Sequence, residues 1–167
     1  TVNNVLNSAN SILKYSKNNN FDISFINSFG EWNEYKNELY GKKINMYDFF
    51  HFEKFNKINK EGFFKSRVSY IYIFLKSFYP LVKLIRKEKP KYLVSYLITS
   101  LPIIIFLIFK FETKLIINIA GQPKLNFLRK FLWKKISKTV SYVICPSIEL
   151  KNNLVKYNIF DESKIFV

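Results

Sequence analysis

The sequence predicts an α/β fold built on a doubly wound parallel sheet with helices on both faces. Three short apolar runs, residues 92–97, 115–119 and 142–145, each end in small, polar or turn-forming residues, and a helix-like segment follows each run. Strands without a polar face are typical of a parallel sheet that is covered on both sides. Ligands of such sheets bind just beyond the carboxyl ends of the strands, so we expect the site there.

The sequence of the first half of the chain predicts fewer helices and strands than that of the second half. In order, they are a helix from Val2 to Leu13, a strand over 21–27, a polar loop with short elements over 31–62, and a long aromatic helix from Phe64 to Lys87. Helical spacing of apolar residues predicts the first helix, and alternation predicts the strand. Pro80 cannot donate a backbone hydrogen bond, so we expect the long helix to bend near it.

The second half alternates regularly between strands and helices. The expected elements are a strand at 92–97, a helix near 101–110, a strand at 114–119, a helix near 124–139, a strand at 142–145, a helix at 148–157 and a strand at 164–167. This order implies crossover connections and therefore a parallel sheet. The chain of 167 residues fits one domain. A helix at Thr1 without a preceding strand, and a strand at Val167 without a linker, suggest a domain truncated at both ends.

A membrane-spanning helix is the rival interpretation of one segment. Residues 92–109 form an eighteen-residue stretch without a charge, which meets the minimum length for a span. Thr99, Ser100 and Pro102 lie in its middle, where they favour the start of a helix instead. An integral membrane protein therefore remains an alternative at this point.

The net charge of +15 is concentrated in one part of the chain. Residues 63–138 hold sixteen Lys or Arg against only Glu88 and Glu112, whereas the rest of the chain is nearly balanced. Such a field attracts phosphate-bearing partners, either an anionic membrane leaflet or nucleic acid. Because no nucleic-acid-binding motif is present, we expect no nucleic acid partner.

Neither the cysteine nor the histidine predicts a catalytic or metal site. Cys145 is the single cysteine and lies within an apolar run, so it is expected to pack in the core, and no intrachain disulfide can form. His51 lies among phenylalanines in the polar loop and is expected to pack there. We predict no metal site.

Residues 87–167 resemble the N-terminal, acceptor-side domain of family 4 glycosyltransferases of the GT-B fold. The resemblance rests on the order of five pieces. They are Lys89-Pro90-Lys91 with the strand that follows it, 114–123 with its Ala120-Gly121-Gln122-Pro123 turn, a basic helix, Val143-Ile144-Cys145-Pro146-Ser147, and the segment 158–167. The helix from Thr1 looks like the helix that follows a glycine-rich first turn in the family. The match is weakest over residues 31–65.

The resemblance implies a Rossmann-like half of a GT-B enzyme, with residues 1–167 as its acceptor domain. The whole enzyme would move a sugar from a UDP- or GDP-sugar to a lipid-linked or polysaccharide acceptor in bacterial cell-envelope synthesis, such as lipopolysaccharide synthesis. The nucleotide-sugar would bind the donor domain, which this sequence lacks, so this domain needs no cofactor and alone is inactive. Such enzymes lie in the cytoplasm on the inner face of the plasma membrane. No catalytic base can be carried over, because Ala120-Gly121-Gln122 stands where some members have a histidine.

The polar residues after the predicted strands are the candidate acceptor-binding groups. They are Gly121, Gln122, Thr99, Ser100, Ser147 and Glu31. Gly121 allows a tight turn or the close approach of a ligand to the backbone, and Gln122 can offer hydrogen bonds to a hydroxyl or phosphate. Each also has a structural interpretation: Gly121 as a plain turn, Ser100 and Ser147 as N-caps, and Glu31 in a solvated loop.

The helix expected near 124–139 predicts membrane contact. Leu125, Leu128, Leu132, Ile136 and Val140 fall on one arc that should face the sheet. The other side is expected to bind an anionic membrane surface through Phe127, Lys130, Phe131, Lys134, Lys135 and Lys138. A solvated helix that contacts other protein is the alternative for this helix, and a non-catalytic membrane-surface module is the alternative for the whole chain.

Overall fold

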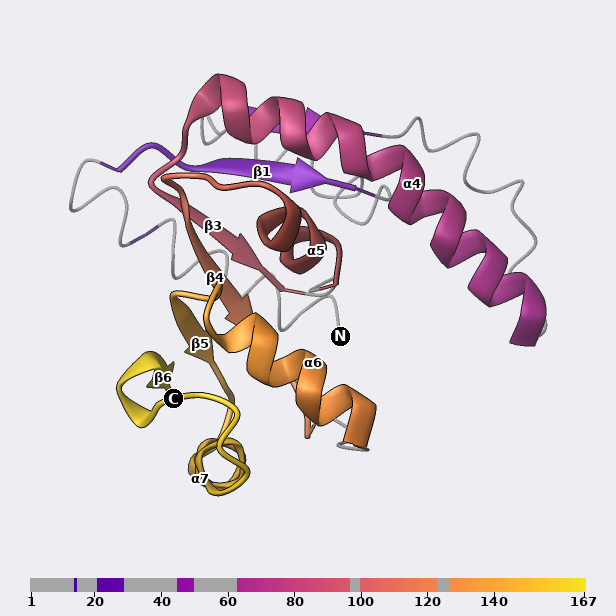
Figure 1. Ribbon diagram of the computed structural model, residues 1–167. Helices are drawn as coiled ribbons and strands as arrows, with labels where there is room; N and C mark the ends of the chain where they lie inside the picture. Colours follow the sequence, from indigo (N-terminus) through magenta and orange to yellow (C-terminus); the bar gives the residue numbers. More distant parts are fainter. Residues whose placement is uncertain (1–13, 15–20, 29–44, 50–62, 97–99, 123–126) are drawn as a thin grey trace. The chain divides into compact units, whose positions relative to one another are not determined.

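The computed structural model describes residue 14 and residues 21–28, 45–49, 63–96, 100–122 and 127–167 (Figure 1). The chain divides into two compact units, Thr1–Ser77 and Phe78–Val167, and each is described by itself. Both contain parallel strands, so the protein is a mixed α/β protein whose parallel sheets are flanked by helices. The helix predicted from Val2 to Leu13 lies outside the described residues.

The first unit contains a two-stranded parallel sheet. Strands β1 (Ser24–Asn27) and β2 (Asn45–Asp48) pair in register from their first residues to their last. At the paired ends, the Asn27 amide Nδ2 donates a 2.7 Å hydrogen bond to Asp48 Oδ1. Asn27 is fully buried, so this bond offsets the cost of removing its amide from water. The strand predicted over 21–27 is confirmed in its second half, and β2 lies within the segment predicted as a polar loop with short elements.

Helix α4 (Phe63–Glu88) begins in the first unit and ends in the second. It confirms the long aromatic helix, and Pro80 lies inside it. The helix ends where Lys89 adopts a left-handed backbone conformation with φ of 43° and donates from its N–H to the Ile85 carbonyl at 3.0 Å. Pro90 comes next and cannot continue the helix, so the sequence Lys89-Pro90 sets its end.

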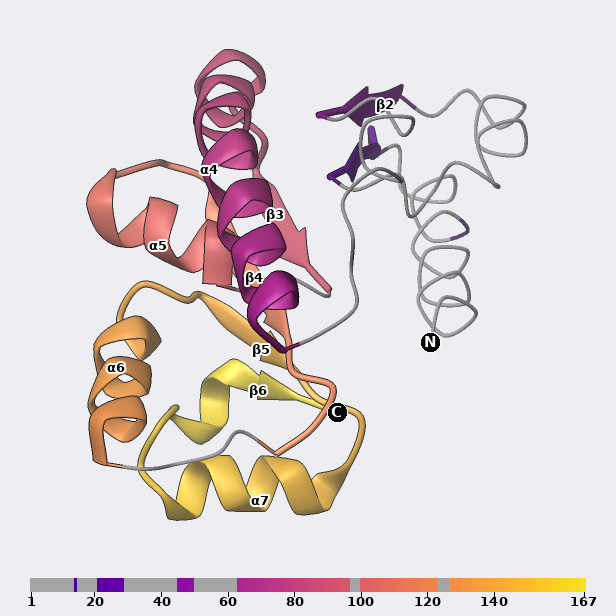
Figure 2. The same ribbon diagram turned by 90° about the vertical axis from the view of Figure 1, so that its right-hand side faces the viewer.

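The second unit is built on a four-stranded parallel sheet in the order β3-β4-β5-β6 (Figures 1 and 2). Its elements are β3 (Tyr92–Ser95), α5 (Ser100–Ile108), β4 (Lys114–Asn118), α6 (Phe127–Ser137), β5 (Tyr142–Ile144), α7 (Ile148–Lys156), the 3₁₀ turn η2 (Glu162–Lys164) and β6 (Ile165–Phe166). All three strand pairs are parallel, as the alternating sequence pattern predicts. Each observed element begins and ends within two residues of its predicted range, except at the start of α6, where residues 123–126 are not described.

One face of this sheet carries the core of the second unit. Leu115, Ile117 and Val143 have no exposed surface, and the alternate residues Ile116 and Ile144 are only half-buried. The buried row packs with residues of all three helices, including Ile103 of α5, Ile136 of α6 and Leu154 of α7. Helices therefore cover this face completely. The alternate side chains, on the second face, are half-buried at these strand positions.

Lys164 ties the last strand to the end of α6. Its Nζ donates to the carbonyl oxygens of Ser137 at 3.0 Å and Val140 at 3.2 Å. These are carbonyls at and just beyond the C-terminus of α6, where backbone acceptors have no helical partner and a positive charge is favourable. Trp133 of α6 also packs edge-on against Phe160, with ring centroids 5.9 Å apart. The sequence pattern predicted neither contact.

The uncharged stretch 92–109 is not a single helix. Its first residues form β3 and its later residues form α5, with residues 97–99 between them outside the described part of the chain. Of the helices in the described ranges, none has the length and apolar character required to cross a membrane.

Lys89 offers a test of the helix end. Replacing Lys89 by Gly should raise the free energy of unfolding by about 0.5–1 kcal/mol, because glycine adopts a positive φ without the clash of a Cβ atom. Asn158 is the matched control: it has a φ of 52°, and asparagine tolerates this conformation better. Asn158→Gly should therefore raise the free energy of unfolding, measured by urea denaturation, by less than Lys89→Gly does. A loss of stability in Lys89→Gly would contradict this account of how α4 ends.

Candidate functional site

The carboxyl ends of the four parallel strands form the candidate site. The turns after the first three strands begin at Tyr96, Ile119 and Cys145. Backbone hydrogen bonds keep these turns aligned: Ile119 N–H donates to the Ile144 carbonyl and Cys145 N–H donates to the Phe166 carbonyl, each at 2.9 Å. The residues just after β4 and β5 therefore lie at one edge of the sheet, where parallel α/β sheets bind ligands.

Gln122 and Ser147, which come after different strands, both lie against α7. The Asn153 amide of this helix donates to Gln122 Oε1 at 3.5 Å, a long and exposed hydrogen bond. Ser147 is the N-cap of α7, and its Oγ accepts from the Leu150 N–H at 3.2 Å. The cap uses the hydroxyl only as an acceptor, so its proton can still be donated to a ligand. Capping thus explains Ser147 structurally and does not prevent acceptor contact.

Gly121 lies in a bend whose geometry does not require glycine. A Cβ atom built on it meets no described atom within 4 Å, and its φ lies outside the left-handed range. Neither strain nor crowding within the described residues therefore requires glycine here. The backbone of Gly121 is exposed next to Gln122, because glycine has no side chain to cover it. A ligand can approach this backbone closely, as the binding interpretation requires.

The other predicted acceptor residues are only partly covered by the structure. Ser100 is half-buried and is the first residue of α5, so it lies inside the helix, and the preceding N-cap position falls outside the described residues. Thr99, Glu31 and also His51 lie outside the described residues. The sheet edge thus brings together Gly121, Gln122 and Ser147, with Ser100 after the neighbouring strand β3.

Tyr96 and Cys145 also follow strands at this edge, and burial affects the ionisation of both side chains. Tyr96 comes directly after β3, and burial raises the pKa of its phenol. Its neutral hydroxyl can both donate and accept at the end of a strand, a role that sequence reasoning missed because Tyr96 sits inside an apolar run. Cys145 is 2% exposed, and its Sγ lies 3.5 Å from the Phe166 carbonyl oxygen.

The environment of Cys145 argues against a nucleophile. Burial raises the pKa of the thiol, while a backbone hydrogen bond at Ser147 and the charge of Lys151 act in the opposite direction with less effect. The protonated thiol is a poor nucleophile. This agrees with the predicted packing role.

Helix α6 presents the residues predicted to bind a membrane. Phe127 is 88% exposed and Phe131 is 64% exposed, and Lys134, Lys135 and Lys138 are also exposed. Lys130 is half-buried, with its Nζ 5.8 Å from the centroid of the Tyr157 ring. On the opposite arc, Ile136 packs against the core and Val140 is buried, as predicted. The side chains of Leu125, Leu128 and Leu132 lie outside the described residues.

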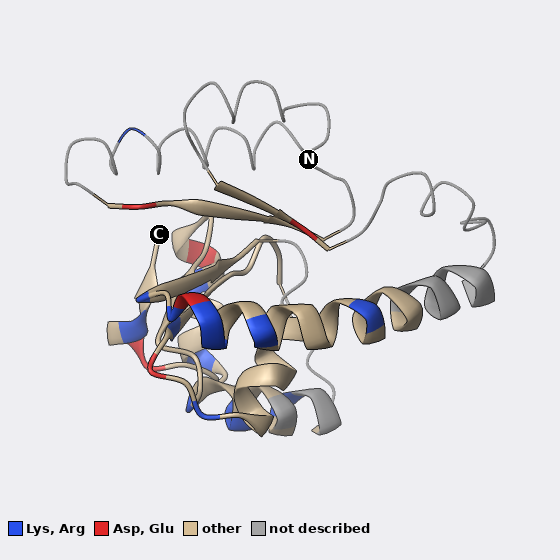
Figure 3. Cartoon of the chain, turned by 90° about the horizontal axis from the view of Figure 1, so that it is seen from above, with Lys and Arg blue, Asp and Glu red and all other residues tan. Residues whose placement is uncertain are grey.

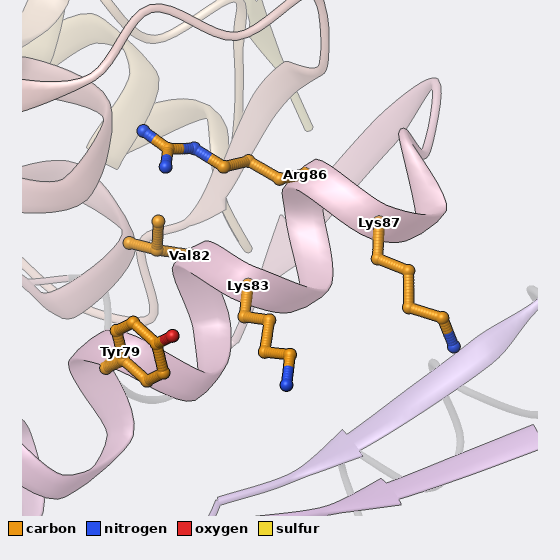
Figure 4. A pocket seen from close by; sticks show the side chains of 5 residues that line it. All are labelled: Tyr79, Val82, Lys83, Arg86 and Lys87. Carbon is orange, nitrogen blue, oxygen red and sulfur yellow. The ribbon is translucent and has the colours of Figure 1, made fainter.

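A shallow depression lies along α4, away from the strand ends. It has a volume of about 320 Å³ and is lined by Tyr79, Val82, Lys83, Arg86 and Lys87. Figure 4 shows Arg86 extending from one side of the helix and Lys83 and Lys87 from the other. Arg86 lies over the Phe109 ring, 5.0 Å from its centroid, and Lys87 pairs with Glu88 at 3.1 Å. These cations therefore do not converge on one point, as an anion site would require.

Acidic and metal-binding groups are scarce in the described part of the chain. Figure 3 shows basic residues distributed along the helices and few acidic ones beside them. No group of three His, Cys, Asp or Glu side chains among the described residues could hold a metal ion.

Searches against protein-family models, curated proteins and solved structures found no match to this chain.

The burial of Cys145 predicts its reactivity. The native chain should react with a maleimide at least about a hundredfold more slowly than the urea-unfolded chain, because the thiol is both inaccessible and protonated. The control is Ile148→Cys in a Cys145→Ala background, since Ile148 is 67% exposed and should react at a normal rate. Fast labelling of native Cys145 at neutral pH would show that this thiol is activated.

Proposed function

We propose that this chain is the acceptor-binding, membrane-docking domain of a family 4 glycosyltransferase of the GT-B fold. In the whole enzyme, a second domain binds a UDP- or GDP-sugar, and the sugar is moved to a lipid-linked or polysaccharide acceptor in cell-envelope glycan synthesis. The enzyme acts in the cytoplasm, on the inner face of the plasma membrane. In this proposal the doubly wound, Rossmann-like sheet forms one wall of the cleft between the two domains.

The parallel order β3-β4-β5-β6 is the observation that carries the acceptor role. It places Gly121, Gln122 and Ser147 at the carboxyl edge of one sheet, where the resemblance to the family expects the acceptor. Exposed amide and hydroxyl groups suit the many hydroxyls of a sugar, because each can donate and accept hydrogen bonds. The resemblance carries no general base over to this chain, and the catalytic group stays unassigned. Glu149, in the first turn of α7, is a described carboxylate close to Ser147.

The outer arc of α6 supports the membrane role. Phe127 and Phe131 are large aromatic side chains that remain in water in this chain, at a cost that insertion into the headgroup region would remove. Lys134 and Lys135 lie one turn after Phe131 on the same helix, and Lys138 lies in the turn that follows it. The sequence contains no acid from Thr113 to Tyr142. An anionic leaflet offers the phosphates that such a surface attracts.

Charge reversal on α6 tests the membrane role. Changing Lys134, Lys135 and Lys138 to Glu should lower partition onto phosphatidylglycerol-containing vesicles by roughly two orders of magnitude or more, since each basic residue near such a surface contributes about 1 kcal/mol. The control changes three exposed lysines elsewhere, Lys89, Lys91 and Lys156, to Glu, so that net charge falls equally. Equal losses in both variants, measured by sedimentation at low salt, would mean that overall charge and not this surface drives binding.

Substitution of Gly121 tests the acceptor site. In the enzyme with its donor domain, Gly121→Val should raise the KM for the acceptor at least about tenfold, because the added side chain occupies the space a ligand needs. The melting temperature should change little, since even a Cβ atom meets no described atom within 4 Å. Gly121→Ala should have a smaller effect on the same KM. Parallel losses of stability and acceptor use would identify Gly121 as a structural turn.

A non-catalytic membrane-surface module is the second candidate. The exposed aromatic and basic arc of α6 favours it, because that surface does not depend on the strand-end site. The two functions differ in the segment that the gene encodes after Val167. A donor domain with paired glutamates there supports the transferase, and an unrelated continuation supports the module.

A further inference from the structure

We propose that the outer stripe of α5 inserts into the membrane beside α6, so that the two helices form one lipid-contact surface. This inference rests on the membrane role proposed above and adds the element that enters the apolar part of the bilayer. The sequence predicts the segment of α5 only as a helix between two strands or as part of a membrane span.

Helix α5 is apolar on all sides, but only one arc of it is buried. Leu101, Pro102, Ile103 and Ile105 are buried against the rest of the unit. Ile104 and Leu107 are each 37% exposed, and Ile108 is 60% exposed. These three positions are spaced i, i+3 and i+4, so they lie on one face of the helix as a continuous stripe. Nine helical residues without a single charge are unusual for a helix that faces only water.

The stripe of α5 points in the same direction as the exposed arc of α6. The strands β3, β4 and β5 are neighbours in sequence order, so successive right-handed crossovers place α5 and α6 on the same face of the sheet. Figures 1 and 2 both show the two helices next to each other on that side. Each packs its inner arc on the core, through Ile103 of α5 and Ile136 of α6. Their exposed arcs therefore both face away from the sheet.

Basic residues lie on both helices that neighbour α5. One of these helices is α6, with Lys134 and Lys135. The other is α4, which contacts the end of α5 through Phe78 and Arg86, both packed on the Phe109 ring. Arg86 is exposed and has Lys83 one turn before it. An apolar helix with basic residues on its two neighbouring helices matches the layering of an anionic leaflet, in which phosphates lie above the acyl chains.

A lipid surface fits this arrangement better than a protein partner does. Protein interfaces are depleted in lysine relative to the rest of the surface, whereas Lys134 and Lys135 lie one helical turn from the exposed Phe131 here. Lysines can keep their ammonium groups in the headgroup region while neighbouring apolar side chains enter deeper. The expected occupant of the stripe is therefore the acyl-chain boundary of an anionic bilayer.

A fluorescent probe tests whether α5 enters the bilayer. In the full chain with Cys145→Ala, an environment-sensitive fluorophore is attached to Ile108→Cys, and in the control to Ile148→Cys, which is similarly exposed but lies on α7. On vesicles of phosphatidylcholine and phosphatidylglycerol, the probe at position 108 should shift to the blue and be quenched by nitroxide-labelled acyl chains. The probe at position 148 should do neither.

Substitution measures how much the stripe contributes. Leu107→Asn with Ile108→Asn should lower vesicle partition about tenfold, given the apolar area that these side chains would bury. The loss should persist at high salt, because the apolar contribution is not screened by ions. Circular dichroism confirms that the variant is folded, and the probe experiment stands independently if it is not.

Three results would overturn the inference. The first is a chain that sediments with vesicles while the probe at position 108 stays accessible to iodide in water. In that case α6 docks without α5, and the membrane role itself survives. The second is a probe at position 108 that is already shielded before vesicles are added, which would show a second copy on the stripe. The third is a chain that does not sediment with anionic vesicles at all, which also removes the membrane role.

Discussion

Burial of one face of the four-stranded sheet is the constraint on which the second unit depends. Leu115, Ile117 and Val143 point to the same side and are completely removed from water. Each such side chain contributes about 1.5–3 kcal/mol relative to an exposed one. A shift of any strand by one residue would exchange this row with the half-buried row and expose it. The register of the strands, and with it the alignment of the turns at their carboxyl ends, is therefore fixed by hydrophobic burial.

The elements of the second unit could be predicted because its pattern is local. Apolar runs of four to six residues, each ending in turn-forming residues, specify buried strands without reference to distant parts of the chain. The end of α4 could be predicted in the same way, since Lys89-Pro90 cannot extend a helix. The resemblance to glycosyltransferases added an expectation about the site, and no comparison with known proteins tests that expectation.

The features that the sequence could not predict depend on contacts between distant residues. The Asn27–Asp48 hydrogen bond joins positions that are twenty-one residues apart, and the segment that supplies Asp48 has no clear strand pattern. The contacts of Lys164 with the end of α6 join residues that are more than twenty positions apart. Gly121 shows the opposite problem: its residue type predicted a tight turn or a close backbone approach, but its observed φ does not need a glycine. Exposure of Ile108 could not be predicted from a helix that is apolar on every side.

The lysines at the end of α6 have a consequence for the stability of the fold. Lys134 and Lys135 lie in its last turn and Lys138 in the turn just after it, and like charges this close repel. Folding of α6 is favourable despite this repulsion because its inner arc packs on the core and Lys164 satisfies carbonyls at its end. These lysines are held close together only when the helix is formed. An anion that neutralises them there therefore lowers the free energy of the folded state and not that of the unfolded state. Anion binding at these lysines and folding are thermodynamically linked. The free energy of unfolding therefore rises when an anion or an anionic surface binds them.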